Sequence, residues 1–363
     1  MKIAHIIEDF SIHSGGLRTV VQELNGRLNN VEGVESFVIS SRKESEDDIF
    51  LVETNKPWLF SKDWEKLFNS IKKDRGIDVI HIHGVWMFPQ YCAAKFAIKN
   101  KIPFILTPHG MYEPWLWEKG RLKKKIYFNS FANSVFSKAS KIHGITSDEI
   151  KNLASIFPSS NFVELPNVID HNKFSLQEDF FVEKKEKYFF YLGRLDAKKG
   201  IDMLIKSFSR LKNDDFKLKI AGPFNAYKIY LEKLVKELKI EDKVEFLGLV
   251  TGEEKERLYK QAFVFVAPSY SEVVGMVNLE AAICKTPVIT TFQTGLDLKW
   301  NDNGGILINP NESELTQALI KVANWTFEER KLKGEHLSDF VKLKYSWQKR
   351  IKDWELLYKS LVQ

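Results

Sequence analysis

The feature that most constrains this chain is the alternation of short apolar runs with longer amphipathic stretches along its whole length. The apolar runs of the first half are rich in β-branched and aromatic residues, as in KIAHII, VIHIH and PFILTPH. A second series begins with YFFYLG at 188–193 and continues through FVFVAPS and PVITT. Near-continuous apolar strands separated by helices are typical of parallel sheets that helices cover on both faces. The sequence therefore predicts an α/β fold with two doubly wound parallel sheets.

The amphipathic stretches between these runs predict the helices. In the first half they span 16–29, 61–74, 90–99, 121–139 and 147–156. In the second half they span 200–212, 226–239, 253–261, 275–284 and 312–324. A last helix is predicted at 346–362, with Trp347, Trp354 and Leu357 on one apolar face. Because this helix begins well after the last strand, we expect its apolar face to dock outside the second domain.

Chain length and one break in the pattern predict two domains. A length of 363 residues fits two domains at roughly 150 residues each. Residues 171–187 are charged and show no clean periodicity, so the boundary is placed there. We expect a first Rossmann-like domain at 1–172, a second at 173–345, and the C-terminal helix at 346–363.

Composition and the absence of some motifs exclude several classes of protein. The 54 Lys and Arg against 48 Asp and Glu are interspersed, so the overall charge does not call for nucleic acid. Two cysteines cannot form a disulfide framework, which fits a reducing cytoplasm. The N-terminus has no secretory pattern, and we expect no spanning helix because no apolar run reaches ~18 residues. Neither dinucleotide-binding nor P-loop glycine motifs occur, so dehydrogenase and NTPase interpretations lose their main support.

The loop at 266–291, VAPSYSEVVGMVNLEAAICKTPVITT, has the features of a diphosphate site. A strand ends at Pro268, and Gly275 opens a helix whose free N–H groups favour an anion. Glu272 in the loop can accept hydrogen bonds from sugar hydroxyls, and Glu280 in the helix from a ribose diol. Taken alone, each acid also has an alternative interpretation. Glu272 fits a solvated charge in a loop, and Glu280 fits an acidic residue that complements the helix dipole.

A second loop, YLGRLDAKKG at 191–200, follows another strand of the same predicted sheet. Arg194 can clamp phosphate oxygens, and Lys199 adds a compact positive charge. Together they could neutralise a leaving diphosphate without a metal. A basic surface loop is the alternative for this segment alone. The diphosphate interpretation is favoured because both loops lie at the same edge of one sheet.

These motifs resemble those of the retaining glycosyltransferases of family 4. The resemblance is carried by Glu272-x7-Glu280 within PSYSEVVGMVNLEA and by GRLDAKKG upstream, and it extends over essentially the whole chain. Further matches are HSGGLRTVVQEL at 13–24, IHIHG at 80–84, TPHGM at 107–111, TSDEI at 146–150, LPNVID at 165–170 and AGP at 221–223. The resemblance implies the GT-B fold: two Rossmann-like domains facing across a cleft, the C-terminal helix crossing back to the first domain.

The resemblance also implies roles for the matching residues. Arg194 and Lys199 would bind and stabilise the leaving diphosphate, and Glu272 would orient the donor sugar. Glu280 would hold the ribose, and His109 would lie beside the donor sugar. Without the resemblance, a structural role is the commoner alternative for His109, as for any histidine that ends a buried strand. His81 and His83 alternate on one strand, and we interpret them as mainly structural. The remaining predicted donor-site residues are Gly15, Gly16, Gly193, Gly222, Pro223, Val274, Gly275, Met276 and Val277.

The chain departs from the family where Glu-Gly-Phe-Gly is common and Glu272-Val273-Val274-Gly275 stands here. The change constrains the loop and alters the pocket wall, which bears on the identity of the donor. No Asp-x-Asp metal motif occurs, and two cations with a helix terminus make a metal redundant. We therefore expect transfer with retention from a UDP- or GDP-linked sugar, with no metal and no cofactor. A front-face route and a double displacement are both open, and the front-face route suits the chain better because no carboxylate stands out as a nucleophile.

Residues Lys95–Lys141 carry ten Lys and Arg but only two acids, an uneven local charge. Within this stretch, PWLWEKGRLKKKIYF interleaves aromatic residues with five basic residues between Trp115 and Phe128. This pattern suits the headgroups of an anionic membrane, so we expect a cytoplasmic enzyme in peripheral contact with the inner leaflet. A solvated helix face is the alternative. Single-stranded nucleic acid ranks last, because no nucleic-acid fold signature accompanies the pattern.

The leading hypothesis is a glycosyltransferase acting on a glycan or lipid-linked glycan in bacterial cell-surface polysaccharide synthesis. One alternative is a nucleotide-sugar 2-epimerase-like enzyme of the same fold, which would need acid and base carboxylates at the sugar. Another is a non-catalytic nucleotide-sugar-binding protein. The presence of Arg194, Lys199, Glu272 and Glu280 together argues against loss of activity.

Overall fold

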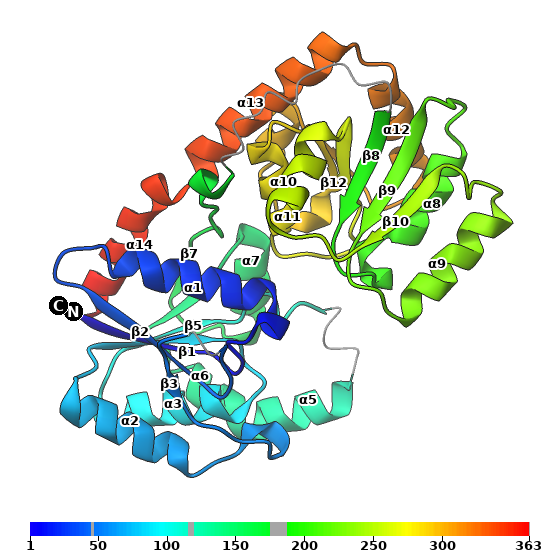
Figure 1. Cartoon of the computed structure of the whole chain (residues 1–363). Coiled ribbons are helices and arrows are strands. Elements are labelled where there is room, and N and C mark those ends of the chain that lie inside the picture. The colour runs from blue at the N-terminus through cyan, green and yellow to red at the C-terminus, as the bar shows by residue number, and fades with distance from the viewer. Residues whose placement is uncertain (45–46, 115–119, 175–186, 363) are drawn as a thin grey trace. The chain divides into compact units, whose positions relative to one another are not determined.

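The computed structural model describes residues 1–44, 47–114, 120–174 and 187–362 (Figure 1). The chain forms two compact units. Unit 1 comprises Met1–Val168 together with Trp347–Gln363, and unit 2 comprises Ile169–Ser346. The first division, after Val168, lies four residues before the expected boundary at 172. The second, after Ser346, lies one residue after the expected boundary at 345. Each unit is built around one parallel sheet.

The sheet of unit 1 has seven strands in the order β3-β2-β1-β4-β5-β6-β7. Their bounds are Lys2–Ile6 (β1), Glu35–Ser40 (β2), Phe50–Leu51 (β3), Val79–His83 (β4), Phe104–Thr107 (β5), Lys141–Gly144 (β6) and Phe162–Glu164 (β7). The strands pair in parallel; in the register, His5 lies opposite His81, and His83 opposite Thr107. The winding reverses between β1 and β4, and ligands bind beyond the carboxyl ends of strands at such a switch point.

Successive residues along the strands of unit 1 pack into two apolar layers, one on each face of the sheet. Ala4 and Ile80 belong to the larger core, which α2 and α3 cover, whereas Ile3 and Val79 face α1 and α14 (Figure 1). The helices are α1 (Gly16–Leu28), α2 (Asp63–Asp74), α3 (Phe88–Asn100), α5 (Arg121–Tyr127), α6 (Asn133–Phe136), α7 (Ser147–Ile156) and α14 (Trp347–Val362).

The C-terminal helix α14 completes unit 1. Its side chains Trp347, Trp354 and Tyr358 are buried in the same cluster as Ile3 of β1 and Leu24 of α1. The apolar face visible in the sequence therefore packs against strands at the opposite end of the chain. A residue in extended conformation, Ser346, separates α14 from the preceding helix.

The sheet of unit 2 has six strands in the order β10-β9-β8-β11-β12-β13, which repeats the winding of unit 1. Their bounds are Lys187–Leu192 (β8), Phe216–Ala221 (β9), Val244–Gly248 (β10), Val264–Ala267 (β11), Val288–Thr291 (β12) and Ile306–Ile308 (β13). Its switch point lies between β8 and β11, the strands that precede the two loops singled out in the sequence.

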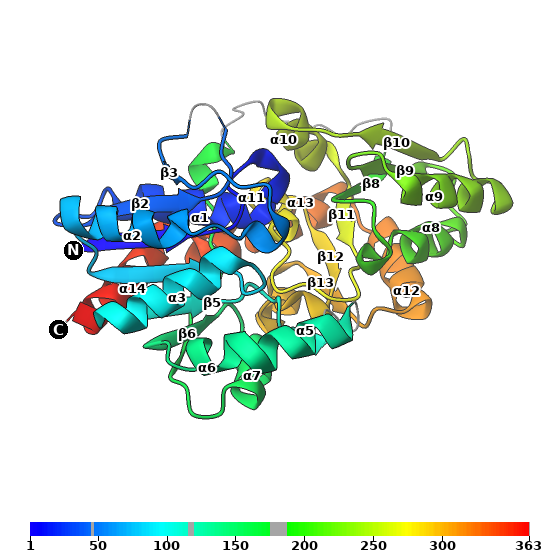
Figure 2. The ribbon, with the colours of Figure 1, turned by 90° about the horizontal axis from the view of Figure 1, so that it is seen from below.

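Helices cover both faces of this second sheet, α8, α9 and α12 on one face and α10, α11 and α13 on the other (Figure 2). They span Ile201–Ser209 (α8), Ala226–Glu237 (α9), Gly252–Gln261 (α10), Met276–Ile283 (α11), Glu312–Ala323 (α12) and Phe327–Tyr345 (α13). The prediction of two doubly wound parallel sheets is confirmed.

Three elements differ from the sequence prediction. The two-residue strand β3 and the helix α13 were not predicted. The helix expected at 121–139 is present from Arg121 to Phe136, but it includes a π-helical turn at Phe128–Ala132 between α5 and α6. In a π-helical turn each hydrogen bond spans one residue more than in an α-helix. No repeat of apolar side chains in the sequence indicates such a turn.

Candidate active site

The first loop of unit 2 begins where the backbones of β8 and β9 meet at two glycines. The N–H of Gly193 donates to the carbonyl of Ala221 at 3.0 Å, and that of Gly222 to Gly248 at 2.7 Å. A Cβ on Gly222 would stand 2.0 Å from the carbonyl oxygen of Gly193. Both glycines of the predicted donor site therefore serve close backbone packing. Pro223, which follows, is exposed.

Arg194 stands exposed at the end of β8 and has no ion-pair partner in the described part of the chain. The hydroxyl of the buried Tyr191 donates to the carbonyl of Arg194 at 3.0 Å and holds its backbone. A fixed backbone with an unpaired guanidinium suits an anion-binding group, because the charge is available and needs little reordering.

The loops after β8 and β11 are tied together. The N–H of Tyr270 donates to the carbonyl of Lys198 at 2.9 Å. At Gly200, which has a left-handed φ of +67°, a Cβ would stand 2.3 Å from the carbonyl oxygen of Pro268. Only glycine fits that approach without displacing one of the loops. The two segments that were predicted to share a sheet edge are thus in direct contact.

Lys199 and Glu272 form an ion pair across this junction. Both side chains are less than one-fifth exposed, at 19% and 17%. The backbone N–H of Glu272 donates to the carbonyl of Gln293 at 2.9 Å, which fixes the loop from a third segment. Each of the two predicted catalytic side chains therefore orients the other.

The helix α11 begins at Gly275 without a side-chain cap. A helix start that lacks a cap leaves N–H donors for an anion. Met276 and Val277 occupy the first turn, and Val274 before them is buried. A Cβ on Gly275 would stand 2.7 Å from Nδ2 of Asn278, so this glycine also serves packing.

Glu280 of α11 is held by two neighbours from α10. Its carboxylate lies 3.1 Å from Nζ of Lys255 and accepts a hydrogen bond from the hydroxyl of Tyr259 at 3.0 Å. These partners fix the orientation of the carboxylate, as recognition of a diol requires. Neither partner was singled out in the sequence, because contacts between helices are not visible in local spacing.

In unit 1, Gly15 is the N-cap residue of α1 and Gly16 is the first residue of that helix, and both are exposed. Gly15 has a φ of +62°, which favours glycine. No heavy atom lies within 4 Å of a Cβ built on either glycine. The turn is therefore open to solvent, and its helix start carries no side-chain cap.

His109 follows β5 and is joined to a row of buried histidines. Its Nε2 lies 2.9 Å from Nδ1 of His83, and Nε2 of His83 lies 2.9 Å from Nδ1 of His5. Burial lowers the pKa of His109, and of His5, to about 3, so these rings are neutral at pH 7. His83 was interpreted as structural, yet it contacts the predicted catalytic histidine directly.

His81 belongs to a second row of hydrogen bonds. Nε2 of His143 lies 2.8 Å from the carbonyl of Leu165, so it must carry the proton. Thr107 then donates to Nδ1 of His143, and Nε2–H of His81 donates to Thr107 at 2.7 Å. The hydroxyl of Tyr358, on α14, consequently donates to Nδ1 of His81 at 2.6 Å.

Glu149 of α7 fixes the turn at His109. Its two carboxylate oxygens accept the backbone N–H groups of Gly110 at 2.6 Å and Ile145 at 2.8 Å. Burial raises the pKa of Glu149 to about 7, although both hydrogen bonds act in the opposite direction. His109 itself has a left-handed φ of +54°, which this anchored turn stabilises. Glu149 lies within the TSDEI motif, but the sequence predicted no role for it.

Among the described residues, His5, His81 and His83 form a cluster with metal-ligand spacing. Every ring nitrogen of His81 and His83 is already hydrogen bonded, so a metal would have to displace this network. The cluster lies on the neighbouring strands β1 and β4 of unit 1.

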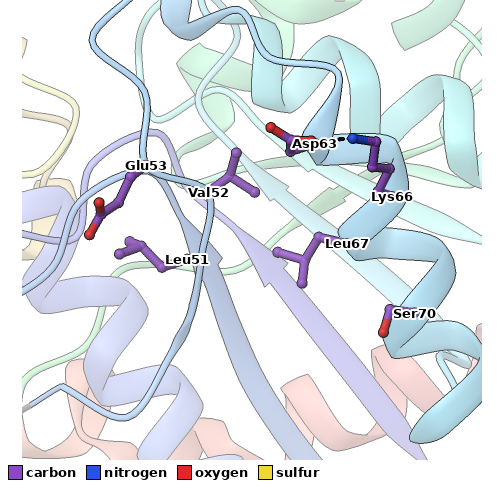
Figure 3. A pocket seen from close by; sticks show the side chains of 7 residues that line it. All are labelled: Leu51, Val52, Glu53, Asp63, Lys66, Leu67 and Ser70. Carbon is purple, nitrogen blue, oxygen red and sulfur yellow. Dashed lines mark hydrogen bonds and ion pairs between the residues drawn. The ribbon is translucent and has the colours of Figure 1, made fainter.

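A cavity of about 440 Å³ lies beside the end of β3 and the start of α2 (Figure 3). Its lining includes Leu51, Val52 and an Asp63–Lys66 ion pair of 2.7 Å. None of the predicted site residues contributes to it. This cavity therefore gives no support to the donor-site assignment.

Comparison with known proteins decides the family. A family model described as Glycosyltransferase Family 4 matches residues 14–173, and one described as Glycosyl transferases group 1 matches 172–333. The chain belongs to glycosyltransferase family 4. It is a GT-B enzyme that transfers a sugar from a nucleotide sugar, in a family that retains anomeric configuration and in general needs no metal.

Relatives of this family 4 enzyme span its whole length. It is 29% identical over 362 residues to an uncharacterized glycosyltransferase of Methanocaldococcus jannaschii, covering 96% of this chain and 95% of the relative. It is 33% identical over 153 residues to the O-antigen chain mannosyltransferase RfbU of Salmonella typhimurium, covering 40% and 42% of the chains. Anabaena Alr3699/HepE, solved in complex with UDP-glucose, has the same fold, with a TM-score of 0.78, 15% identity, and 99% and 100% coverage.

None of the helices within the described residues is long and apolar enough to cross a membrane. Trp115 and Trp117, which carry part of the predicted membrane contact, lie outside the described residues. The helix α5 carries four of the five basic residues of this predicted contact and lies within the described residues.

Proposed function

We propose that this glycosyltransferase transfers a hexosyl group from a UDP- or GDP-linked sugar to a glycan or lipid-linked glycan of a bacterial cell-surface polysaccharide. The observation that carries the donor assignment is the convergence of an unpaired Arg194, the Lys199–Glu272 ion pair and the uncapped start of α11. All three occur beyond the carboxyl ends of β8 and β11, at the switch point of the sheet.

In this proposal each group has a defined task. Arg194 and Lys199 neutralise the leaving diphosphate together with the N–H groups of Met276 and Val277. Glu272 orients the donor sugar, Glu280 accepts the ribose hydroxyls, and His109 binds beside the sugar. The carbon–oxygen bond to the phosphate breaks while the acceptor oxygen bonds to the same carbon on the same face. The acceptor proton passes to the departing phosphate.

Two observations support the donor base and the pathway. Alr3699/HepE, which shares the fold, was solved with UDP-glucose, and RfbU, which shares part of the sequence, is an O-antigen chain mannosyltransferase. The basic helix α5 supports an acceptor on an anionic membrane surface, since four of its seven residues are Lys or Arg. We place the enzyme in the cytoplasm, in peripheral contact with the inner leaflet.

The test is the slow transfer of sugar to water, which needs no identified acceptor. UDP- and GDP-sugars are incubated with the enzyme, with and without EDTA, and the anomer first released is identified by proton NMR. We expect one donor class to be cleaved with retention, equally in EDTA. Glu272→Ala should abolish cleavage, whereas Glu241→Ala, an exposed acid on the same unit, should not. Release of the inverted anomer, or full activity of Glu272→Ala, would overturn the assignment.

A further inference from the structure

An aromatic groove in unit 1 is not accounted for by the donor site. It is a cavity of about 460 Å³ whose walls are Trp58, Trp86, Tyr127 and Phe131 and whose rim carries Lys123 and Lys124. The ring centroids of Trp58 and Tyr127 lie 5.3 Å apart, and those of Trp58 and Phe131 lie 6.3 Å apart. Its volume falls within the ~300–1,000 Å³ typical of ligand pockets.

Two segments with an unusual backbone conformation form the sides of the groove. Trp58 and Leu59 have left-handed φ values of +62° and +55°, a conformation that costs about 1–3 kcal/mol per residue. The indole N–H of Trp58 donates to the carbonyl of Trp86 at 2.8 Å and fixes this wall. On the other side the π-helical turn Phe128–Ala132 follows Tyr127, and such turns are frequent at functional sites.

Two apolar side chains that line the groove are largely exposed. The exposed fraction is 55% for Ile126 and 44% for Phe131. The hydroxyl of Tyr127 is buried and accepts or donates no hydrogen bond within the described part of the chain. Exposed apolar side chains gathered at a concave site mark a place where an apolar ligand is bound.

The helix α5, which borders the groove, carries only positive charges. The helix contributes Arg121, Lys123, Lys124 and Lys125 and no acid, and Nζ of Lys124 lies 5.2 Å from the ring centroid of Trp86. Arg121, Lys123 and Lys125 form no ion pair with any described residue. An apolar cavity with a cationic rim matches a hydrocarbon chain that ends in a phosphate or diphosphate.

We propose that the aromatic groove binds the proximal hydrocarbon chain of a lipid-linked acceptor, with its phosphate groups against the α5 lysines. The assignment to the acceptor rests on the proposed function and adds the lipid class to it. A membrane surface alone needs only exposed charge and apolar side chains. A concave site walled by four aromatic rings is suited instead to a single chain.

The experiment titrates the full chain with dodecyl phosphate below its critical micelle concentration, by calorimetry. Dodecyl maltoside supplies the chain without the anion, and inorganic pyrophosphate supplies the anion without the chain. We expect dodecyl phosphate to bind more tightly than either. Ile126→Ser and Phe131→Ser should weaken binding about tenfold, and Lys123→Ala should reduce the affinity toward that for the maltoside.

Matched controls lie elsewhere on the same unit. Leu356→Ser on α14 removes an apolar side chain that is 65% exposed, and Lys138→Ala removes an exposed lysine. Both should bind dodecyl phosphate like the wild type. Equal affinity in all variants, equal binding of pyrophosphate, or binding to phosphatidylglycerol vesicles without binding of monomeric dodecyl phosphate would each overturn the groove assignment.

Thermal shift by UDP and GDP, measured on the same variants, separates this proposal from the proposed function. A nucleotide shift without dodecyl phosphate binding leaves the donor site standing and removes the groove. Dodecyl phosphate binding without any nucleotide shift keeps the groove as a lipid site and removes the UDP- or GDP-linked donor of the proposed function, on which the assignment to the acceptor rests.

Discussion

At the scale of single residues, the two carboxylates predicted to bind the donor each have a cation beside them. Glu272 pairs with Lys199, and Glu280 lies 3.1 Å from Lys255. These cations orient the carboxylates, whose oxygens can accept hydrogen bonds from sugar hydroxyls. Arg194 differs, because no described residue neutralises it. We therefore expect the leaving diphosphate to interact most directly with Arg194.

Arg194→Ala should lower kcat about 10²-fold or more, because a charged donor aimed at the leaving group acts mainly in the transition state. Steady-state kinetics with the donor sugar measure the effect. Lys236→Ala, an exposed cation on α9 of the same unit, should be unchanged. If Arg194→Ala raised KM and left kcat unchanged, Arg194 would stabilise the ground state and the transition state equally, which would contradict this role.

The row His5–His83–His109 should fix the tautomer of His109. If His109 carried its proton on Nε2, the row would end in a buried N–H of His5 with no acceptor, since Nε2 of His5 has no described partner. A buried unpaired donor is rarer than a buried unpaired acceptor. We therefore expect the proton of His109 on Nδ1, where it can donate to substrate.

Nitrogen NMR of the imidazole rings tests this order. The wild type should show His109 as the Nδ1–H tautomer, and His83→Leu should let both tautomers populate while leaving the fold intact. An Nε2–H tautomer in the wild type would reverse the proton order along the row.

At the scale of elements, most strands and helices could be predicted from periodicity because their buried faces are apolar. The helix α13 could not, since its buried stripe includes Arg330, Gly334 and Ser338. Arg330 donates to the carbonyls of Phe263 at 3.1 Å and Ala262 at 2.6 Å, and a Cβ on Gly334 would stand 2.0 Å from the carbonyl of Lys285. Polar and small residues used for packing in this way break the apolar signal.

The residues of the candidate site, like the helices and strands, could be predicted from the sequence only in part. The loops after β8 and β11 carry local motifs, so Arg194, Lys199, Glu272 and Glu280 could be singled out. Glu149 and the His83–His109 contact could not, because they depend on which strands lie side by side. The register of β1, β4 and β5 brings those side chains together, and register is not encoded in any one segment.

The helix α14 should hold unit 1 together from the far end of the chain. Trp354→Ala removes a buried aromatic side chain and should cost about 3–5 kcal/mol in the free energy of unfolding. Tyr358→Phe leaves Nδ1 of His81 without its donor and should cost about 1–3 kcal/mol. Chemical denaturation measures both. Leu356→Ala, exposed on the same helix, should change stability by less than about 0.5 kcal/mol.

At the scale of the whole molecule, unit 1 should lose stability in acid. Burial lowers the pKa of His5 to about 3 and of His143 to about 4, and lowers those of His81 and His83 well below 6.5. Groups buried neutral stabilise the fold fully above the unfolded pKa of about 6.5 and lose that contribution as the pH falls. Each can change stability by up to about 1.4 kcal/mol per pH unit.

Glu149 acts in the opposite direction. Its folded pKa of about 7 exceeds the unfolded value, so its contribution is full below about pH 4.5 and is lost as the pH rises to 7. With His109, whose pKa burial also lowers to about 3, five histidines outweigh one carboxyl. We expect unfolding experiments to show stability falling steadily from pH 6.5 to 4.5. The fall should steepen in Glu149→Gln. Constant stability over that range would contradict a neutral histidine network.

The measurement that tests the central claim most directly is a calorimetric titration of UDP and GDP into the whole chain, in EDTA, for the wild type and Arg194→Ala. The central claim is that the loops after β8 and β11 form a diphosphate site that needs no metal. We predict that one nucleoside diphosphate binds the wild type in EDTA and binds Arg194→Ala at least about tenfold more weakly. Failure of both nucleotides to bind the folded wild type, or binding only when a divalent metal is restored, would contradict the account.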